Sequence, residues 1–172
     1  FTKQIVDCLY TGISTDTGCF RYTNTTADTF RIAASLVELG CNSAYINKVM
    51  FETKSKEKIM LEREVYDTIT YCANEKCAIV WVTLDMLKSL NIGEDEIEGL
   101  ASIPRQIEGV LIGITMKEKE GGFFKISVRT NGDIDAAKFC SKFGGGGHKA
   151  AAGCSVNGSL EDVRSQLIKA AE

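Results

Sequence analysis

The stretch Gly144-Gly145-Gly146-Gly147-His148-Lys149-Ala150-Ala151-Ala152-Gly153 joins four consecutive glycines to the single histidine of the chain. Because glycine has no Cβ, a run of glycines can adopt left-handed conformations and let another group approach the main chain closely. Successive backbone N–H groups in such a run can converge on one anion. The stretch therefore predicts either a phosphate-binding loop or a flexible surface loop, and alone it favours neither.

The residues around the glycines have the pattern of a small domain that mixes helices and strands. Residues 77–83 form a continuous apolar run typical of a buried strand. Two further strands at 110–116 and 123–129 are joined by a Gly-Gly turn, which predicts an antiparallel hairpin. A short strand is expected at 154–156, and a short helix or turn at 84–90. Helices are expected over 93–103, after a cap at Asp133 and after a cap at Ser159. The expected fold class is α/β (α+β mixed), with a mixed sheet flanked by helices.

The N-terminal part is expected to be helical. Apolar residues recur at helical spacing over 2–13, 28–39 and 43–51, and the polar stretch 12–18 between the first two reads as a turn. Residues 53–76 carry only a thin apolar stripe, which favours a long connecting helix. The predicted organisation is a helical part over 1–53, a linker helix over 54–76 and a second domain over 77–172.

Composition limits the kinds of partner that the chain can have. The 172 residues carry a formal net charge of −3, which argues against a broad basic surface for long nucleic acids. A small phosphorylated ligand held by a few cations remains compatible with that charge. No apolar run has the length of a membrane span, and seven irregularly spaced cysteines predict reduced thiols and a cytoplasmic location. Because the chain opens on Phe1 rather than Met, we expect a piece of a longer protein.

Two side chains outside the glycine stretch are candidates for a site. Asp16 lies among hydroxyl residues in Ser14-Thr15-Asp16-Thr17-Gly18, where it would either help to bind a divalent cation or serve as a turn residue. Because one carboxylate does not make a metal site, the residues favour the turn. Arg129 ends the second hairpin strand, where it would grip a phosphate bidentately or remain a solvated surface arginine.

Three stretches together resemble the DHH-type phosphoesterases of the oligoribonuclease and phosphoadenosine-phosphate phosphatase type. Residues 11–20 (TGISTDTGCF) are similar to the last metal-binding motif of that family. Residues 144–153 are similar to the signature of its DHH-associated C-terminal domain, and Ser127-Val128-Arg129-Thr130 matches that domain's substrate arginine. The resemblance runs along nearly the whole chain.

The resemblance implies a metal-dependent hydrolase that acts on short RNA or DNA oligonucleotides or on a nucleoside bisphosphate. It implies two Mn²⁺ ions, with Asp16 as one ligand, and a substrate-binding domain that uses Arg129 and the four residues Gly145, Gly146, Gly147 and His148. The chain departs from the family because it has neither an Asp-His-His motif nor an upstream His with Asp-x-Asp. We therefore expect the C-terminal part of such an enzyme, with no complete catalytic set and no turnover of its own.

Two other functions stay open. Alanyl-tRNA synthetase and its editing relatives end in a similar glycine-containing domain that serves RNA binding or oligomerisation. A non-catalytic nucleotide-binding module would use the same cations and glycines. The resemblance implies no membrane partner, and it leaves a homodimer open.

Overall fold

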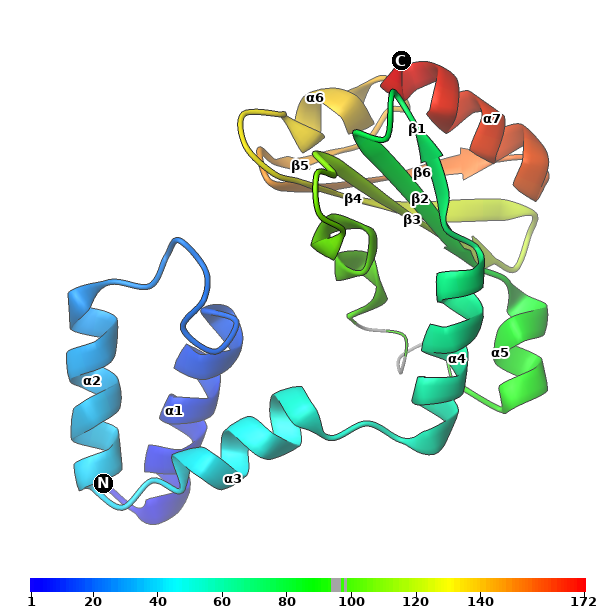
Figure 1. Ribbon diagram of the computed structural model, residues 1–172. Coiled ribbons are helices and arrows are strands. Elements are labelled where there is room, and N and C mark those ends of the chain that lie inside the picture. Colours follow the sequence, from blue (N-terminus) through cyan, green and yellow to red (C-terminus); the bar gives the residue numbers. More distant parts are fainter. Residues whose placement is uncertain (94–96, 98) are drawn as a thin grey trace. The chain divides into compact units, whose positions relative to one another are not determined.

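The computed structural model describes residues 1–93, 97 and 99–172, and the chain forms two compact units, Phe1–Lys54 and Ser55–Glu172 (Figure 1). The first unit is helical throughout. Its elements are α1 (Lys3–Asp16), α2 (Ala27–Glu38), α3 (Ser43–Asn47) and a π-helical turn η1 (Lys48–Glu52). Its small core consists of the buried residues Val6, Tyr10, Ala33, Leu36 and Cys41.

The first helix is longer than its sequence predicts. The residues expected to form a turn from Gly12 onward continue α1 to Asp16, so that part of the prediction is wrong. Hydroxyl groups explain the extension, because the side chain of Thr15 donates to the carbonyl of Thr11 at 2.8 Å and stays inside the helical hydrogen-bond pattern. The chain reverses only at Gly18 and the two residues after it, which all have positive φ.

The second unit is built on one six-stranded sheet. Its strands are β1 (Thr70–Cys72), β2 (Cys77–Val82), β3 (Ile112–Lys119), β4 (Phe123–Thr130), β5 (Gly146–His148) and β6 (Ala151–Asn157). They lie in the order β1-β2-β3-β4-β6-β5, and only β2 and β3 run parallel. The helices are α4 (Lys56–Asp67), α5 (Leu84–Leu90), η2 (Leu100–Ser102), η3 (Pro104–Gln106), α6 (Ala136–Ser141) and α7 (Leu160–Ala171). This arrangement confirms the mixed α/β class.

Helices cover the two faces of the sheet unequally (Figure 1). On one face, α6 and α7 bury apolar residues of β2, β3, β4 and β6 in the larger core, where Ile114, Ile126 and Leu167 are at most 1% exposed. On the other face, α4 packs on β2 and on α5, η2 lies against β3 and β4, and Leu61 and Val80 are buried completely. No residue of β4, β5 or β6 belongs to this second cluster, and the described helices on that face lie against β2, β3 and β4 rather than against β5 and β6.

Several sequence predictions need correction in the second unit. The linker helix expected over 54–76 ends at Asp67, and β1 follows it. Asp135 rather than Asp133 caps α6, because its carboxylate accepts the N–H of Lys138 at 3.0 Å. The helix expected over 93–103 falls partly on residues 94–96 and 98, outside the described residues, and its described end contains the short turn η2.

Other predictions for this unit are confirmed. The hairpin of β3 and β4 turns through Gly121 and Gly122, which both have positive φ. Ser159 caps α7, and its hydroxyl accepts the N–H of Asp162. Among the residues that the structure describes, no helix has both the length and the apolar character needed to cross a membrane.

Candidate functional site

The strand register brings Arg129 and His148 into one row. Arg129 of β4 pairs with Ala151 of β6, and Ala151 pairs with His148 of β5. Directly opposed residues point to the same side of a sheet, so both basic side chains stand on the face opposite α6 and α7. Two strand spacings separate their Cα atoms by about 10 Å, with only the methyl group of Ala151 between them.

The same register defines a surface that we call the open face. It consists of the residues of β4, β5 and β6 that point away from α6 and α7: Lys125, Ser127, Arg129, Gly146, His148, Ala151, Gly153 and Ser155. Each of them is exposed or half-buried, whereas their strand neighbours Phe124, Ile126 and Val128 are buried. Small residues at the centre leave the backbone accessible beneath the basic side chains.

The glycine stretch is partly a strand and not simply a loop. Gly146–His148 form β5, although strands rarely contain consecutive glycines. Close packing on β6 explains this, because a Cβ on Gly145 would lie 2.2 Å from the carbonyl oxygen of Gly153. A Cβ on Gly147, where φ is +148°, would lie 2.6 Å from the Cα of Ala152. An added Cβ on Gly146 would meet nothing within 4 Å. The glycines at 145 and 147 therefore let β5 lie close to β6, and Gly146 leaves its outer surface without a side chain.

The open face is positively charged in the part that the structure describes. The side chains of Lys125, which is exposed, and of His148 make no hydrogen bond or ion pair with any described residue, and the Arg129 guanidinium donates only to the carbonyl of Val128 at 3.1 Å. Glu118 of β3 pairs with Phe124 on the other side of the sheet and accepts the N–H of Leu84 at 2.9 Å. The described cations of this face therefore have no carboxylate to neutralise them, which favours an anionic ligand.

A surface hollow of about 480 Å³ extends the open face toward α6. It is lined by Lys125, Phe143, Gly144, Gly145, Gly146, Gly153, Cys154 and Ser155. Glycine backbone forms much of its wall, while Lys125, Ser155 and the Phe143 ring supply a cation, a hydroxyl and an aromatic surface. Sequence reasoning missed Lys125 and Ser155. The alternation of polar and apolar residues along 124–129 was the signal that marks Lys125 as lying on the same side as Arg129.

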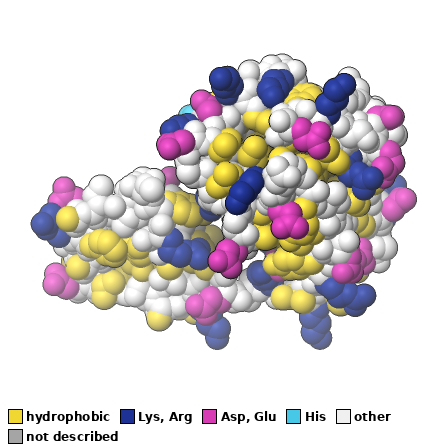
Figure 2. Space-filling model, turned by 45° about the horizontal axis from the view of Figure 1, so that its top comes forward, with side chains coloured by type: hydrophobic (Ala, Val, Ile, Leu, Met, Phe, Trp, Pro, Cys, Tyr) yellow, Lys and Arg dark blue, Asp and Glu magenta, His cyan; other side chains and the backbone are white. Residues whose placement is uncertain are grey.

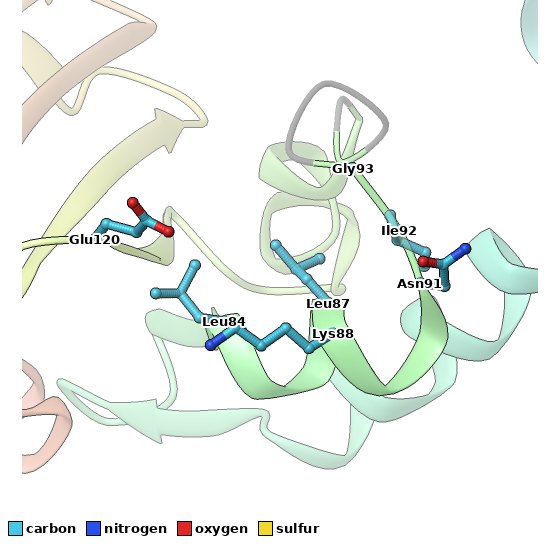
Figure 3. A pocket seen from close by; sticks show the side chains of 7 residues that line it. All are labelled: Leu84, Leu87, Lys88, Asn91, Ile92, Gly93 and Glu120. Atoms are coloured by element: carbon cyan, nitrogen blue, oxygen red, sulfur yellow. The ribbon is translucent and has the colours of Figure 1, made fainter.

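A second hollow, of about 390 Å³, lies beside α5 (Figure 3). Its lining residues are Leu84, Leu87, Lys88, Asn91, Ile92, Gly93 and Glu120. Lys88 and Glu120 balance each other in charge, and leucine side chains form much of the wall. This hollow therefore lacks the surplus positive charge of the open face.

Asp16 lies in the other unit, at the last residue of α1. Its carboxylate accepts a hydrogen bond from the Asn24 side chain at 2.9 Å and lies at the negative end of the helix dipole, where a nearby cation would stabilise it. Among the described residues, however, no three His, Cys, Asp or Glu side chains are grouped so that they could hold a metal ion. The residues that the structure describes therefore do not by themselves fit a two-metal centre.

Comparison with known proteins relates the open face to a family. The bifunctional oligoribonuclease and PAP phosphatase NrnA of Thermus thermophilus is 31% identical over 180 residues, which cover 99% of this chain and 53% of that protein. The A-adding tRNA nucleotidyltransferase of Aquifex aeolicus is 27% identical over 162 residues, which cover 92% of this chain and 19% of that protein. The chain thus spans about half the length of the Thermus protein.

A solved structure and a family model agree with these relatives. An exopolyphosphatase-related protein from Bacteroides fragilis superimposes with a TM-score of 0.91 at 25% identity, covering 99% of this chain and 50% of that one. The model of the DHHA1 domain matches residues 74–172, a range that includes every strand of the open face. Because this match covers more than half of the chain, the chain belongs to the DHHA1 domain family.

Proposed function

We propose that residues 55–172 bind the phosphate groups of short oligonucleotides or of a nucleoside bisphosphate on the open face. The row of Arg129, Ala151 and His148 carries this proposal, because it sets two basic side chains about 10 Å apart over a floor without bulky side chains. A guanidinium binds phosphate through paired hydrogen bonds, and the imidazole supplies a further donor. The exposed strand β5 adds backbone N–H groups from glycines.

The names of the relatives support a nucleotide ligand. One relative is an oligoribonuclease and PAP phosphatase, and another is a tRNA nucleotidyltransferase, so the shared region occurs with two different reactions. What these names have in common is a ligand that carries a nucleotide. This favours a role for the shared region in binding rather than in one particular chemical step.

We further propose that the chain is the C-terminal part of a phosphoesterase that depends on two Mn²⁺ ions. The coverage of only 53% of the Thermus protein supports this, as do the large apolar side chains exposed on α2 and α3 of the first unit (Figure 2). Phe30, Ile32 and Tyr45 are each more than half exposed, as expected of a surface that further polypeptide covers. A homodimer that uses the same side chains is the alternative occupant of that surface.

In this proposal Asp16 is one metal ligand, and the other ligands come from residues that this chain does not contain. The chain alone is expected to bind phosphate ligands weakly and to hydrolyse nothing. Mn²⁺-dependent hydrolysis of an oligonucleotide by the purified 172-residue chain would contradict this part of the proposal. The seven free thiols support the cytoplasm as the location, since reducing compartments keep thiols unpaired.

Two substitutions test the binding site directly. Arg129→Ala and His148→Ala each remove one charge-assisted donor, and each should weaken the binding of adenosine 3′,5′-bisphosphate by about 1.5–3 kcal/mol in isothermal titration calorimetry. The matched control is Lys169→Ala, which removes a cation from α7 on the covered side of the sheet. Unchanged affinity in both Arg129 and His148 variants would contradict the proposed site.

A non-catalytic binding module, as in alanyl-tRNA synthetase relatives, would share this binding behaviour. The two functions differ in what the intact protein does to a bound oligonucleotide. Release of mononucleotides from an oligoribonucleotide in the presence of Mn²⁺ by the intact protein supports the phosphoesterase. Binding without release supports the module.

A further inference from the structure

We propose that the hollow beside Lys125 is a second nucleotide subsite, which receives the nucleotide adjoining the one held by Arg129 and His148. This inference rests on the proposed function and specifies its substrate class. The subsite would take the next phosphate and base of an oligonucleotide. A nucleoside bisphosphate, which ends after one nucleotide, would not reach it.

The spacing of the two cations supports two separate phosphate contacts. Lys125 and Arg129 lie on the same side of β4 and four residues apart, which separates their Cα atoms by about 13 Å. Strand side chains stand roughly perpendicular to the sheet, so the two cationic groups lie over different points of the open face. A single phosphate held between Arg129 and His148 would therefore leave Lys125 available for another one.

The row that contains Lys125 is unusually rich in positive charge. Lys117 of β3 lies directly opposite Lys125, and Ser155 lies on the other side of it. The Lys117 ammonium also donates to the carbonyl of Ile97 at 3.4 Å. The side chain of Lys125, by contrast, is exposed and makes no ion pair or hydrogen bond within the described part of the chain.

The hollow itself has the composition of a nucleotide subsite. Lys125 and Ser155 supply donors for a phosphate, and the aromatic residue Phe143 also lines the hollow. Aromatic rings bind bases of any sequence by stacking. The wall between them is the backbone of Gly144 and Gly146, where an added Cβ would meet nothing within 4 Å. Bare backbone here leaves room for a ligand to lie flat.

The test compares a one-nucleotide ligand with a longer one. Isothermal titration calorimetry of the whole 172-residue chain would measure adenosine 3′,5′-bisphosphate and the 5′-phosphorylated trinucleotide pApApA. Lys125→Ala should weaken the binding of pApApA by about tenfold, as expected for the loss of one charge-assisted hydrogen bond. The affinity for the bisphosphate should stay unchanged. The slope of log K against log salt for pApApA should fall by about 0.7.

The controls separate this inference from the proposed function. Arg129→Ala should weaken the binding of both ligands. Lys169→Ala, on the covered side of the sheet, should change the binding of neither. Equal loss of both ligands in Lys125→Ala, or loss of neither, would overturn the second subsite while leaving the phosphate site of Arg129 and His148 intact. Failure of the wild-type chain to bind either ligand would overturn both proposals together.

Discussion

Replacing Gly145 by alanine tests how the glycine stretch is built. A Cβ at this position would lie 2.2 Å from the carbonyl oxygen of Gly153 and 2.4 Å from the Cβ of Cys154. Backbone atoms cannot rotate out of the way as the end of a side chain can, so β5 must move away from β6. Overpacking of this kind costs about 2–3 kcal/mol, near the upper end of its usual range.

The expected change in melting temperature follows from the size of the second unit. Unfolding entropy of about 2.1 cal/mol/K per residue, applied to Ser55–Glu172, converts this cost into a Tm lowered by about 8–12 °C. Differential scanning calorimetry of the whole chain measures the shift. Gly146→Ala is the matched control, because its Cβ would meet nothing within 4 Å, and its Tm should stay within about 2 °C of wild type. Equal shifts in the two variants would refute the packing of β5 described here.

Two further predictions concern titratable groups. Burial raises the pKa of the Cys77 thiol, and a hydrogen bond with Cys154 together with burial raises the pKa of the Cys140 thiol. A maleimide at neutral pH should therefore label the exposed Cys8 long before it labels Cys77 or Cys140. Early labelling of Cys77 in peptide mass spectra would contradict this prediction. A hydrogen bond from Lys3 lowers the pKa of the Asp7 carboxyl below its ordinary value of 3.8, so the stability that this pair contributes at neutral pH is lost as pH falls through the lowered pKa. Asp7→Asn should therefore lower the Tm of the first unit at pH 7 and make the stability of that unit less sensitive to acid. An acid transition identical to that of the wild type would contradict the assigned role of the Lys3–Asp7 pair.

Local sequence signals predict the long elements of this fold well. The apolar run 77–83, the Gly-Gly hairpin and the Ser159 cap each appear as expected, because each depends on residues close together in the chain. The short strands β1 and β5 escape such signals. Thr70–Cys72 continue the pattern of the preceding helix, and two of the three residues of β5 are glycine, so only pairing with β2 and β6 makes them strands.

The candidate site was predictable in its residues and not in its geometry. The glycines, His148 and Arg129 stand out in the sequence because of their types and their resemblance to a known motif. Their meeting in one row depends on the pairing of β4, β6 and β5, and a register shift of one residue would place Arg129 on the covered face. No local pattern specifies that register. The exposure of β5 and β6 on that face likewise follows from where α4 and η2 pack.

The central claim is that the open face binds phosphate through Arg129, His148 and the glycine backbone. The most direct measurement follows backbone amide NMR signals of the whole chain as adenosine 3′,5′-bisphosphate is added. If phosphate binds there, the largest shifts should occur at residues 145–148 and at Arg129 and Ala151, with little change in α7. Largest shifts at the α5 hollow that Leu84 and Lys88 line, or no shifts on the open face at saturating ligand, would contradict it.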